Sequence, residues 1–340
     1  MMRLLLALLM TLAWGGAVQA ADAPPPPRIV EPTHRDIAYA PAMPATSKGH
    51  LLDLYLPARA DKPVPLVIWT SGSAWMADTG KDGAKVMAPA LLEAGFAVAG
   101  VSIRSSTQAR FPAQVHDIKA AIRFLRANAA RYGIDPARIA IMGDSSGGWT
   151  SAMAALTGDA PELEGTLGTT GVPSTVQAAV ALYPPTDFVE MDRWALVQCS
   201  ASTPLPRPGF CHDDAASPES RLVGCAIQTC KEGVQRASPM AYITPADPPL
   251  MILHGRSDGL VPYNQGERLF KALAHACRTA ELYTLPLAPH GPPNGFLEDP
   301  ALQQGASVER SAAQGCKVDL PRMEMPGWGP VIAFLKRHLQ

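Results

Sequence analysis

A serine flanked by small residues follows one of the apolar runs of this sequence. The segment 143–148 reads GDSSGG, after the apolar run 138–142 and before the helix-like run 149–156. In a sharp strand–turn–helix connection, small neighbours permit a tight turn that exposes the serine hydroxyl, and the first N–H groups of the helix face developing negative charge. Without that context the string would be an ordinary Gly-rich turn. We therefore interpret Ser145 as a candidate nucleophile.

A nucleophilic serine needs a base, and the base needs an acid to orient it. Asp258 and His290 each come just after an expected strand, and the order Ser145, Asp258, His290 is one in which serine hydrolases carry a catalytic triad. Asp187 also follows an expected strand and is the alternative acid. His254 lies near Asp258 in sequence, but we interpret it as a buried hydrogen-bonding residue.

A third requirement is a group of donors for the oxyanion of a tetrahedral intermediate. The loop SGSAW (71–75) follows the apolar run 65–69, where enzymes with such a triad place these donors. We expect the backbone N–H groups of Ser73, Ala74 and Ser146 to bind the oxyanion, and one such donor is typically worth ~10²–10³ in rate. The alternative is an ordinary polar turn.

The elements that position these residues alternate along the chain. Short apolar runs typical of buried parallel strands occur at 65–69, 97–103, 138–142, 176–183 and 249–253, with further strand candidates at 35–40, 50–56 and 281–285. Helical periodicity is clearest at 113–132, and 149–156, 264–277 and 330–339 are further candidates. Alternating strands and helices predict one α/β domain, with a mostly parallel sheet flanked by helices.

The N-terminal segment has the pattern of a secretory signal peptide. Arg3 precedes an apolar run over 4–14, and small residues end at Ala20. The run is too short to span the ~30 Å hydrocarbon core of a bilayer, so we expect cleavage and no stable membrane span. The Pro-rich stretch 21–34 is expected to be an extended tether, and 35–340 the folded domain.

The region of about 193–236 shows no convincing period and is too long for an ordinary loop. It contains four of the six cysteines, which are Cys199, Cys211, Cys225, Cys230, Cys277 and Cys316. An even count in an exported chain favours disulfides, and the spacings match no common zinc template. We therefore expect a disulfide-stabilised cap. Six cysteines allow 15 pairings, and a Cys277–Cys316 bond is our hypothesis because it would close a ring around His290.

Composition narrows the classes of partner. The chain has 29 Lys and Arg against 30 Asp and Glu, a formal charge of −1. Since no basic surplus is available to neutralise a phosphate backbone, we expect no nucleic-acid partner.

Together these motifs resemble the esterase/lipase branch of the α/β-hydrolase superfamily, in particular bacterial feruloyl-esterase-like and acetyl-esterase-like proteins near the hormone-sensitive-lipase group. The resemblance spans about residues 51–296. Besides the segments above, it rests on RFPAQVHD (110–117), YGIDP (132–136), ASP (237–239) and HG (290–291). The His-Gly-Gly-Gly loop usual in that group is SGSA here, and Ser146 stands where alanine is usual.

The resemblance implies a secreted or periplasmic serine carboxylic-ester hydrolase of the α/β-hydrolase fold, with a Cys-rich cap. It would act through an acyl-enzyme on small or carbohydrate-linked esters, without cofactor or metal. One alternative is a serine peptidase of the prolyl-oligopeptidase type, which normally carries a large extra domain for which this length leaves no room. Another is a non-catalytic binding protein of the same fold, which predicts the loss of a triad member. The ester's acyl and alcohol groups and the oligomeric state stay open.

Overall fold

A single large sheet forms the centre of the protein in the computed structural model, which describes residues 27–204 and 207–339. The expected signal peptide (1–20) and the first part of the tether lie outside these residues. The later part of the tether lies against the body, because the Val30 N–H donates to the Lys85 carbonyl oxygen (3.1 Å).

The sheet is parallel in the middle and antiparallel at both edges. Its strands are β1 (His34–Ala38), β2 (Leu51–Tyr55), β3 (Val64–Thr70), β4 (Ala97–Val101), β5 (Ile134–Asp144), β6 (Ala178–Leu182), β7 (Leu250–Gly255), β8 (Ala280–Leu285), β9 (Ser307–Ala312), β10 (Lys317–Val318) and β11 (Arg322–Met323). The spatial order is β1-β2-β4-β3-β5-β6-β7-β8-β9-β10, with β11 also paired to β9. From β4 to β8 all neighbours are parallel, so the ends of β3, β5, β7 and β8 meet at one edge.

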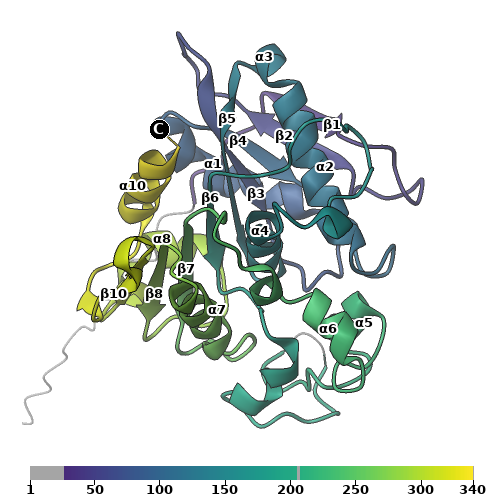
Figure 1. Cartoon of the computed structure of the whole chain (residues 1–340), viewed down its shortest axis with the longest axis vertical. Helices are drawn as coiled ribbons and strands as arrows, with labels where there is room; N and C mark the ends of the chain where they lie inside the picture. Colours follow the sequence, from purple (N-terminus) through teal and green to yellow (C-terminus); the bar gives the residue numbers. More distant parts are fainter. Residues whose placement is uncertain (1–26, 205–206, 340) are drawn as a thin grey trace, which may run out of the picture.

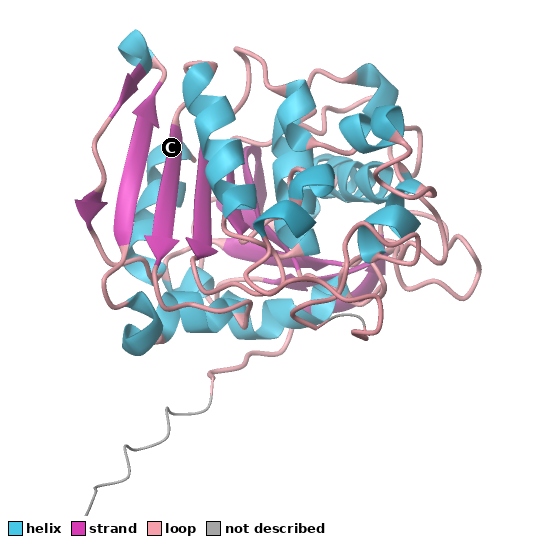
Figure 2. Ribbon diagram, turned by 90° about the horizontal axis from the view of Figure 1, so that it is seen from below, coloured by secondary structure: helices cyan, strands magenta, loops and turns pink. Residues whose placement is uncertain are grey.

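Helices cover both faces of this sheet (Figure 2). They are α1 (Ala84–Glu93), α2 (Ala113–Ala127), α3 (Ala129–Tyr132), α4 (Ser146–Leu156), α5 (Pro218–Val223), α6 (Lys231–Arg236), α7 (Asn264–His275), α8 (Pro293–Glu298), α9 (Pro300–Gln303) and α10 (Trp328–His338). Side chains of α2, α4 and α7 share one apolar core with the sheet, and those of α1, α8 and α10 share the other. Successive residues of a strand face opposite sides, so Ile68 belongs to the first core and Trp69 to the second.

The α/β-hydrolase architecture expected from the sequence is confirmed, with local differences. The expected helix 113–132 is divided at Asn128, whose side-chain amide donates to the Phe124 carbonyl oxygen (2.9 Å) in competition with the helix backbone. Two features were not predicted. Helix α1 carries Pro89 in its interior, a residue that normally ends helices, and β9 lacks an apolar run because it lies near an antiparallel edge.

The described residues of the insertion of about 193–236 form a small cap beside α4, with α5 and α6 next to each other (Figure 1). A third apolar cluster lies beneath it, where Leu222, Ile227 and Val234 of the cap pack with Trp149 of α4. The Trp149 indole N–H also donates to the Ala237 carbonyl oxygen (2.8 Å). The cap is therefore packed against the sheet's helical layer, with its own core.

All six cysteines are in disulfides. The cap contains the bonds Cys199–Cys211 and Cys225–Cys230, and Cys277 after α7 is joined to Cys316 before β10. The third bond is the one hypothesised from the sequence, and it ties together the ends of the segment that carries His290.

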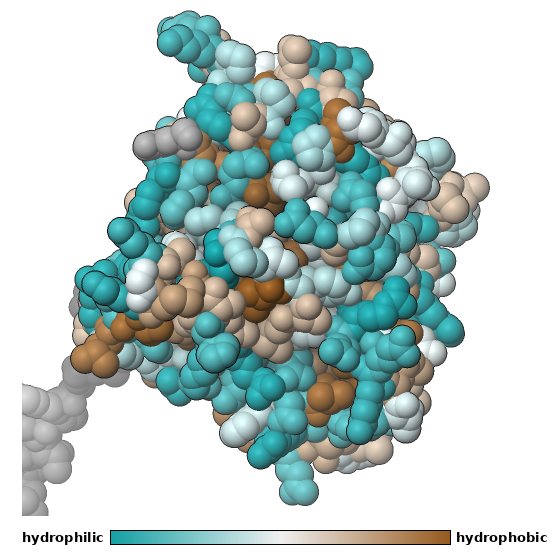
Figure 3. Space-filling view, in the orientation of Figure 1, coloured by the Kyte–Doolittle hydropathy of each residue, from teal (hydrophilic) through white to brown (hydrophobic). Residues whose placement is uncertain are grey.

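The surface shown in Figure 3 mixes polar and apolar residues, and apolar side chains gather at the edge where β10 lies. Val318, Leu320, Met323 and Met325 are exposed there. Within the described part of the chain, no helix has both the length and the apolar character needed to cross a bilayer.

Candidate active site

Ser145 occupies a sharp turn between β5 and α4. Its backbone φ of 53° is in the left-handed region that side chains rarely adopt. The turn depends on two glycines. A Cβ at Gly143 would lie 2.5 Å from the Gly147 carbonyl oxygen, and one at Gly147 would collide with the carbonyl oxygen of Thr70. The small residues around Ser145 are thus required by close backbone approach.

The three residues of the candidate triad come together at the carboxyl edge of the sheet. His290 Nε2 lies 3.1 Å from Ser145 Oγ, and His290 Nδ1 lies 2.8 Å from Asp258 Oδ2. Because a carboxylate only accepts hydrogen bonds, Nδ1 carries the proton and Nε2 presents its lone pair to the serine. The arrangement is therefore set for transfer of the serine proton to His290.

Asp258 is fully buried and ionised. Its Oδ1 accepts the N–H groups of Leu260 (2.9 Å) and Val261 (2.8 Å), which fixes the carboxylate in its loop. Burial alone would raise the pKa of Asp258, but the adjacent imidazoles of His254 and His290 outweigh it and hold that pKa well below its usual range. A negative charge is thus kept behind His290.

The alternative acid and the second histidine considered in the sequence have other partners. Asp187 Oδ2 pairs with Arg268 Nη2 at 2.7 Å, so this alternative acid is engaged by a different partner. His254 is fully buried, and its Nε2 lies 3.0 Å from the Val261 carbonyl oxygen, as expected for a structural histidine.

The loop 71–75 lies directly against the turn that carries Ser145. The Gly72 N–H donates to Asp144 Oδ1 (3.0 Å), and a Cβ at Gly72 would lie 2.5 Å from the Ser145 Cβ. Ala74 has a φ of 51° and Trp75 a φ of 55°, so the loop is held in a strained conformation. Asp144, which the sequence did not link to this loop, is therefore one of its anchors.

One expected oxyanion donor is engaged differently. The Ser73 N–H was predicted to face the oxyanion, but it donates to Ser146 Oγ (2.9 Å), and the Trp75 N–H approaches the same oxygen at 3.3 Å. The reason is the hydroxyl at position 146, which offers the loop an acceptor that alanine lacks. Ala74 and Ser146 themselves line the cavity beside Ser145.

That cavity is small, about 20 Å³. Its walls come from the sheet edge and from the cap, and they consist of Ala74, Trp75, Ser145, Ser146, Pro185, Phe210, His212, Pro218, Glu219, Leu260 and Val261. The sequence did not identify Phe210, His212 or Glu219 as site residues. The cysteine pattern indicated only that the cap is ordered.

Among the described residues, one group of three side chains has the spacing of metal ligands: Asp192, Cys199 and Cys211. The two sulfur atoms are bonded to each other. They cannot act as thiolate ligands in this state, so the group does not make a thiolate metal centre.

Comparison of the chain with models of known protein families identifies its family. The BD-FAE family model matches residues 52–273. The chain belongs to the BD-FAE family. The matched range includes Ser145 and Asp258, and His290 lies beyond it.

Similar proteins are named as esterases. The BD-FAE chain is 29% identical to the probable carboxylic ester hydrolase LipM of Mycobacterium tuberculosis over 228 aligned residues. The alignment covers 66% of this chain and 49% of LipM. The chain spans about half the length of the curated relatives it matches.

Two solved structures also resemble it. One is a bifunctional GH43-CE protein from Bacteroides eggerthii, with a TM-score of 0.71 and 31% identity over 90% of this chain and 38% of that one. The other is a truncated carbohydrate esterase from gut microbiota, with a TM-score of 0.70 and 29% identity over 89% of this chain and 95% of that one.

Proposed function

We propose that this protein is an exported serine carboxylic-ester hydrolase that acts on small or carbohydrate-linked esters through an acyl-enzyme. The observation that carries the proposal is the continuous contact from Ser145 Oγ through the His290 imidazole to the buried Asp258 carboxylate. The esterase names of the relatives and the carbohydrate-esterase name of one structural neighbour support the same reaction class.

In the first half of the reaction, His290 Nε2 takes the proton of Ser145 as its oxygen attacks the ester carbonyl. The Asp258 charge stabilises the imidazolium that forms. The N–H groups of Ala74 and Ser146 stabilise the oxyanion, since both residues line the cavity beside the nucleophile. His290 then protonates the leaving alcohol, which breaks the ester C–O bond and leaves the acyl group on Ser145.

In the second half, water takes the place of the alcohol. His290 accepts a proton from the water as its oxygen attacks the acyl carbonyl, and returns that proton to Ser145 Oγ as the acid is released. The active site ends in its starting state, so the protein's own groups account for every proton moved.

Export is the second element of the proposal. The three disulfides support it, because such bonds persist mainly in oxidising compartments. N-terminal sequencing of the protein recovered from outside the cytoplasm should give a first residue just after Ala20. A mature chain that retains its first twenty residues would contradict cleavage.

The reaction is tested with p-nitrophenyl acetate and a fluorophosphonate label. We expect hydrolysis by the wild type, covalent labelling at Ser145 by peptide mass spectrometry, and a fall in kcat of ~10⁶ for Ser145→Ala. Ser151→Ala is the matched control and should retain activity, because Ser151 lies in α4 behind the nucleophile and its hydroxyl donates to the Gly147 carbonyl oxygen. Labelling at another residue, or a Ser145→Ala variant with a tenth of the activity, would overturn the assignment.

A further inference from the structure

The cap places a carboxylate in the wall of the cavity that contains Ser145. Glu219, in the first turn of α5, is only 3% exposed and lines this cavity together with His212. Carboxylates are rarely this buried unless they are paired, because removal from water disfavours the charge. Both residues belong to the disulfide-bonded insertion, and the reaction proposed above makes no use of either.

The pairing of Glu219 is incomplete. His212 Nδ1 lies 3.1 Å from Glu219 Oε1, and His212 Nε2 lies 3.0 Å from the Leu260 carbonyl oxygen. The carbonyl only accepts, so Nε2 holds a proton. Burial alone would lower the pKa of His212, but the Glu219 and Asp192 carboxylates outweigh it and raise that pKa. Glu219 Oε2 is also buried, and neither this oxygen nor His212 Nδ1 has a hydrogen-bond partner of good geometry within the described structure.

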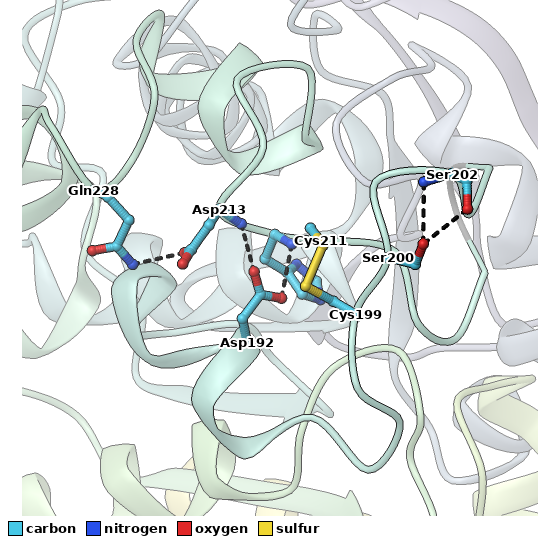
Figure 4. Close-up of a disulfide and its surroundings, with 8 residues drawn as sticks. Asp192, Cys199, Ser200, Ser202, Cys211, Asp213 and Gln228 are labelled. Carbon is cyan, nitrogen blue, oxygen red and sulfur yellow. Dashed lines mark hydrogen bonds between the residues drawn. A yellow bond between two sulfur atoms is a disulfide. The ribbon is translucent and has the colours of Figure 1, made fainter.

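The loop beneath this pair is held rigidly. The Asp192 carboxylate accepts the N–H groups of His212 (2.9 Å) and Asp213 (2.8 Å), and the Cys199–Cys211 disulfide lies next to them (Figure 4). Gln228 also donates to Asp213 Oδ1 (2.7 Å). The bond from His212 to Leu260 joins this loop to the one that holds Asp258. The loop that carries His212, the residue against Glu219 Oε1, is therefore fixed relative to the loop of Asp258.

Glu219 borders the cavity, so the size of the cavity limits the groups that can approach its carboxylate. A cavity of about 20 Å³ is near the minimum that holds one water molecule, so it has no room for a long acyl chain. A buried carboxylate oxygen requires a hydrogen-bond donor. A water molecule and a substrate hydroxyl both meet this requirement, and a hydroxyl next to the reacting ester replaces the water without leaving the carboxylate oxygen unpaired.

We propose that Glu219 forms a subsite for a substrate hydroxyl close to the scissile ester, so that the enzyme prefers hydroxy-substituted esters over otherwise similar esters. This inference rests on the proposed ester hydrolysis and adds its substrate class. The hydroxyl donates to Glu219 Oε2, while Oε1 stays against His212. A hydrogen bond to a charged group in a desolvated site is typically worth a factor of ~10–100 in selection against an analogue that lacks the donor.

The hydroxyl can belong to the alcohol or to the acyl part, and two substrate pairs separate these sources. The first pair is 2-hydroxyethyl acetate against 2-methoxyethyl acetate, and the second is ethyl glycolate against ethyl methoxyacetate. In each pair a methyl group replaces the donated proton. We expect the wild type to show a kcat/KM at least about tenfold higher for the hydroxy member of one pair, and that pair identifies the side of the ester that Glu219 contacts.

The variant Glu219→Gln retains the side-chain shape and removes the charge, so the same preference should fall below about threefold. Glu232→Gln is the matched control, because Glu232 is an exposed glutamate of the cap in α6, and its preference should equal that of the wild type. Each preference is a ratio within one protein and is therefore independent of the amount of folded enzyme.

The outcomes are distinct. Loss of the preference in Glu219→Gln but not in Glu232→Gln supports the subsite. Equal kcat/KM within both pairs for the wild type, or an unchanged preference in Glu219→Gln, overturns it, and the wild-type measurement does so even where the variant fails to fold. Failure of the proposed function looks different, because then neither these esters nor p-nitrophenyl acetate is hydrolysed and no phosphonate labels Ser145.

Discussion

The carboxyl edge of the sheet and the cap both line the cavity beside Ser145, but they are held in place by different means. At the sheet edge, Ser145, Asp258 and His290 follow β5, β7 and β8, whose ladders fix the ends of the strands relative to one another. In the cap, short helices are held by two disulfides, the Asp192 carboxylate and an apolar cluster against Trp149.

Under the proposed function, this difference separates catalysis, at the sheet edge, from the choice of substrate, in the cap. Backbone ladders position groups precisely enough for proton transfer, in which a small misplacement is costly. The cap contributes none of the three residues of the proposed triad, yet it supplies His212 and Glu219 to the cavity wall. Changes at the sheet edge should therefore act on kcat for every ester, and changes in the cap should act on the choice between esters.

The largest effect that would test this separation is expected for Asp258→Asn. The amide can still accept the N–H groups of Leu260 and Val261, but its NH₂ group would face His290 and favour the wrong tautomer. We expect kcat to fall by ~10⁴ for all esters alike. Steady-state kinetics on the two substrate pairs measures this. A variant whose loss differs strongly between the hydroxy and methoxy esters would contradict the separation.

Asp258→Asn also has a pH signature in stability. Because the pKa of Asp258 is lowered in the folded state, its contribution is present above the unfolded value of about 4 and is lost as the pH falls below it. The difference in unfolding free energy between wild type and variant should therefore shrink from pH 7 to pH 3. Urea unfolding at the two pH values checks this, and a constant difference would show that folding does not lower the pKa of Asp258.

The disulfide around the His290 segment and one disulfide of the cap allow a further test of the comparison. The Cys277–Cys316 bond closes a sequence separation of 39 residues, and Cys199–Cys211 one of 12. Loop entropy predicts a loss of about 4 kcal/mol in unfolding free energy when both cysteines of the first bond are changed to serine, and about 3 kcal/mol for the second.

The two double variants should differ in which kinetic quantity changes, kcat for all esters or the preference between esters. Without the Cys277–Cys316 bond, the segment that carries His290 is less constrained, so kcat should fall a few-fold for all esters. Without the Cys199–Cys211 bond, the loop below His212 loosens and the preference for hydroxy esters should decline. Urea unfolding and the substrate pairs measure both effects. Identical changes in preference for the two double variants would show that the cap has no separate role.

The two regions also differ in how far the sequence predicts them. Apolar runs in the sequence predict strands β3 to β7, because burial on both faces leaves a simple signal, and 281–285 is a more mixed candidate for β8. Asp258 and His290 are placed after the ends of β7 and β8. The order of the three residues along the chain then agreed with a known arrangement. The apolar runs, the GDSSGG motif and the order along the chain together select the three candidate residues that the structure brings into contact.

The cap offers no such signal. Its helices α5 and α6 have six residues each, too few for a recognisable period, and the cysteines indicate only that the insertion is ordered. That Glu219 lies beside Ser145 depends on contacts between residues distant in sequence. The hydrogen bond from the Ser73 N–H to Ser146 Oγ likewise depends on a side-chain orientation that the spacing of residues does not encode.

A smaller loss of kcat than that of Asp258→Asn is expected when the Ser73 N–H is removed. Ser73→Ala retains this donor to Ser146 Oγ and should change kcat by less than about threefold. Ser73→Pro removes the N–H and should shift the neighbouring Ala74, with a loss of ~10²–10³, comparable to the loss of an oxyanion donor. Kinetics with p-nitrophenyl acetate distinguishes the two. Equal losses would instead implicate the Ser73 hydroxyl.

The smallest effect is expected for Ser146→Ala, which removes the acceptor of the Ser73 and Trp75 N–H groups and keeps the backbone N–H of residue 146. Ala74 and Trp75 are in the left-handed region, so this acceptor helps to hold a strained loop. We expect kcat to fall about tenfold, equivalent to ~1.4 kcal/mol, with little change in KM, because the loop acts mainly in the transition state. Ser151→Ala in the same helix should stay within about twofold. An increase in kcat for Ser146→Ala would mean that the freed Ser73 N–H joins the oxyanion donors, and that the hydroxyl at position 146 restrains the reaction instead of supporting it.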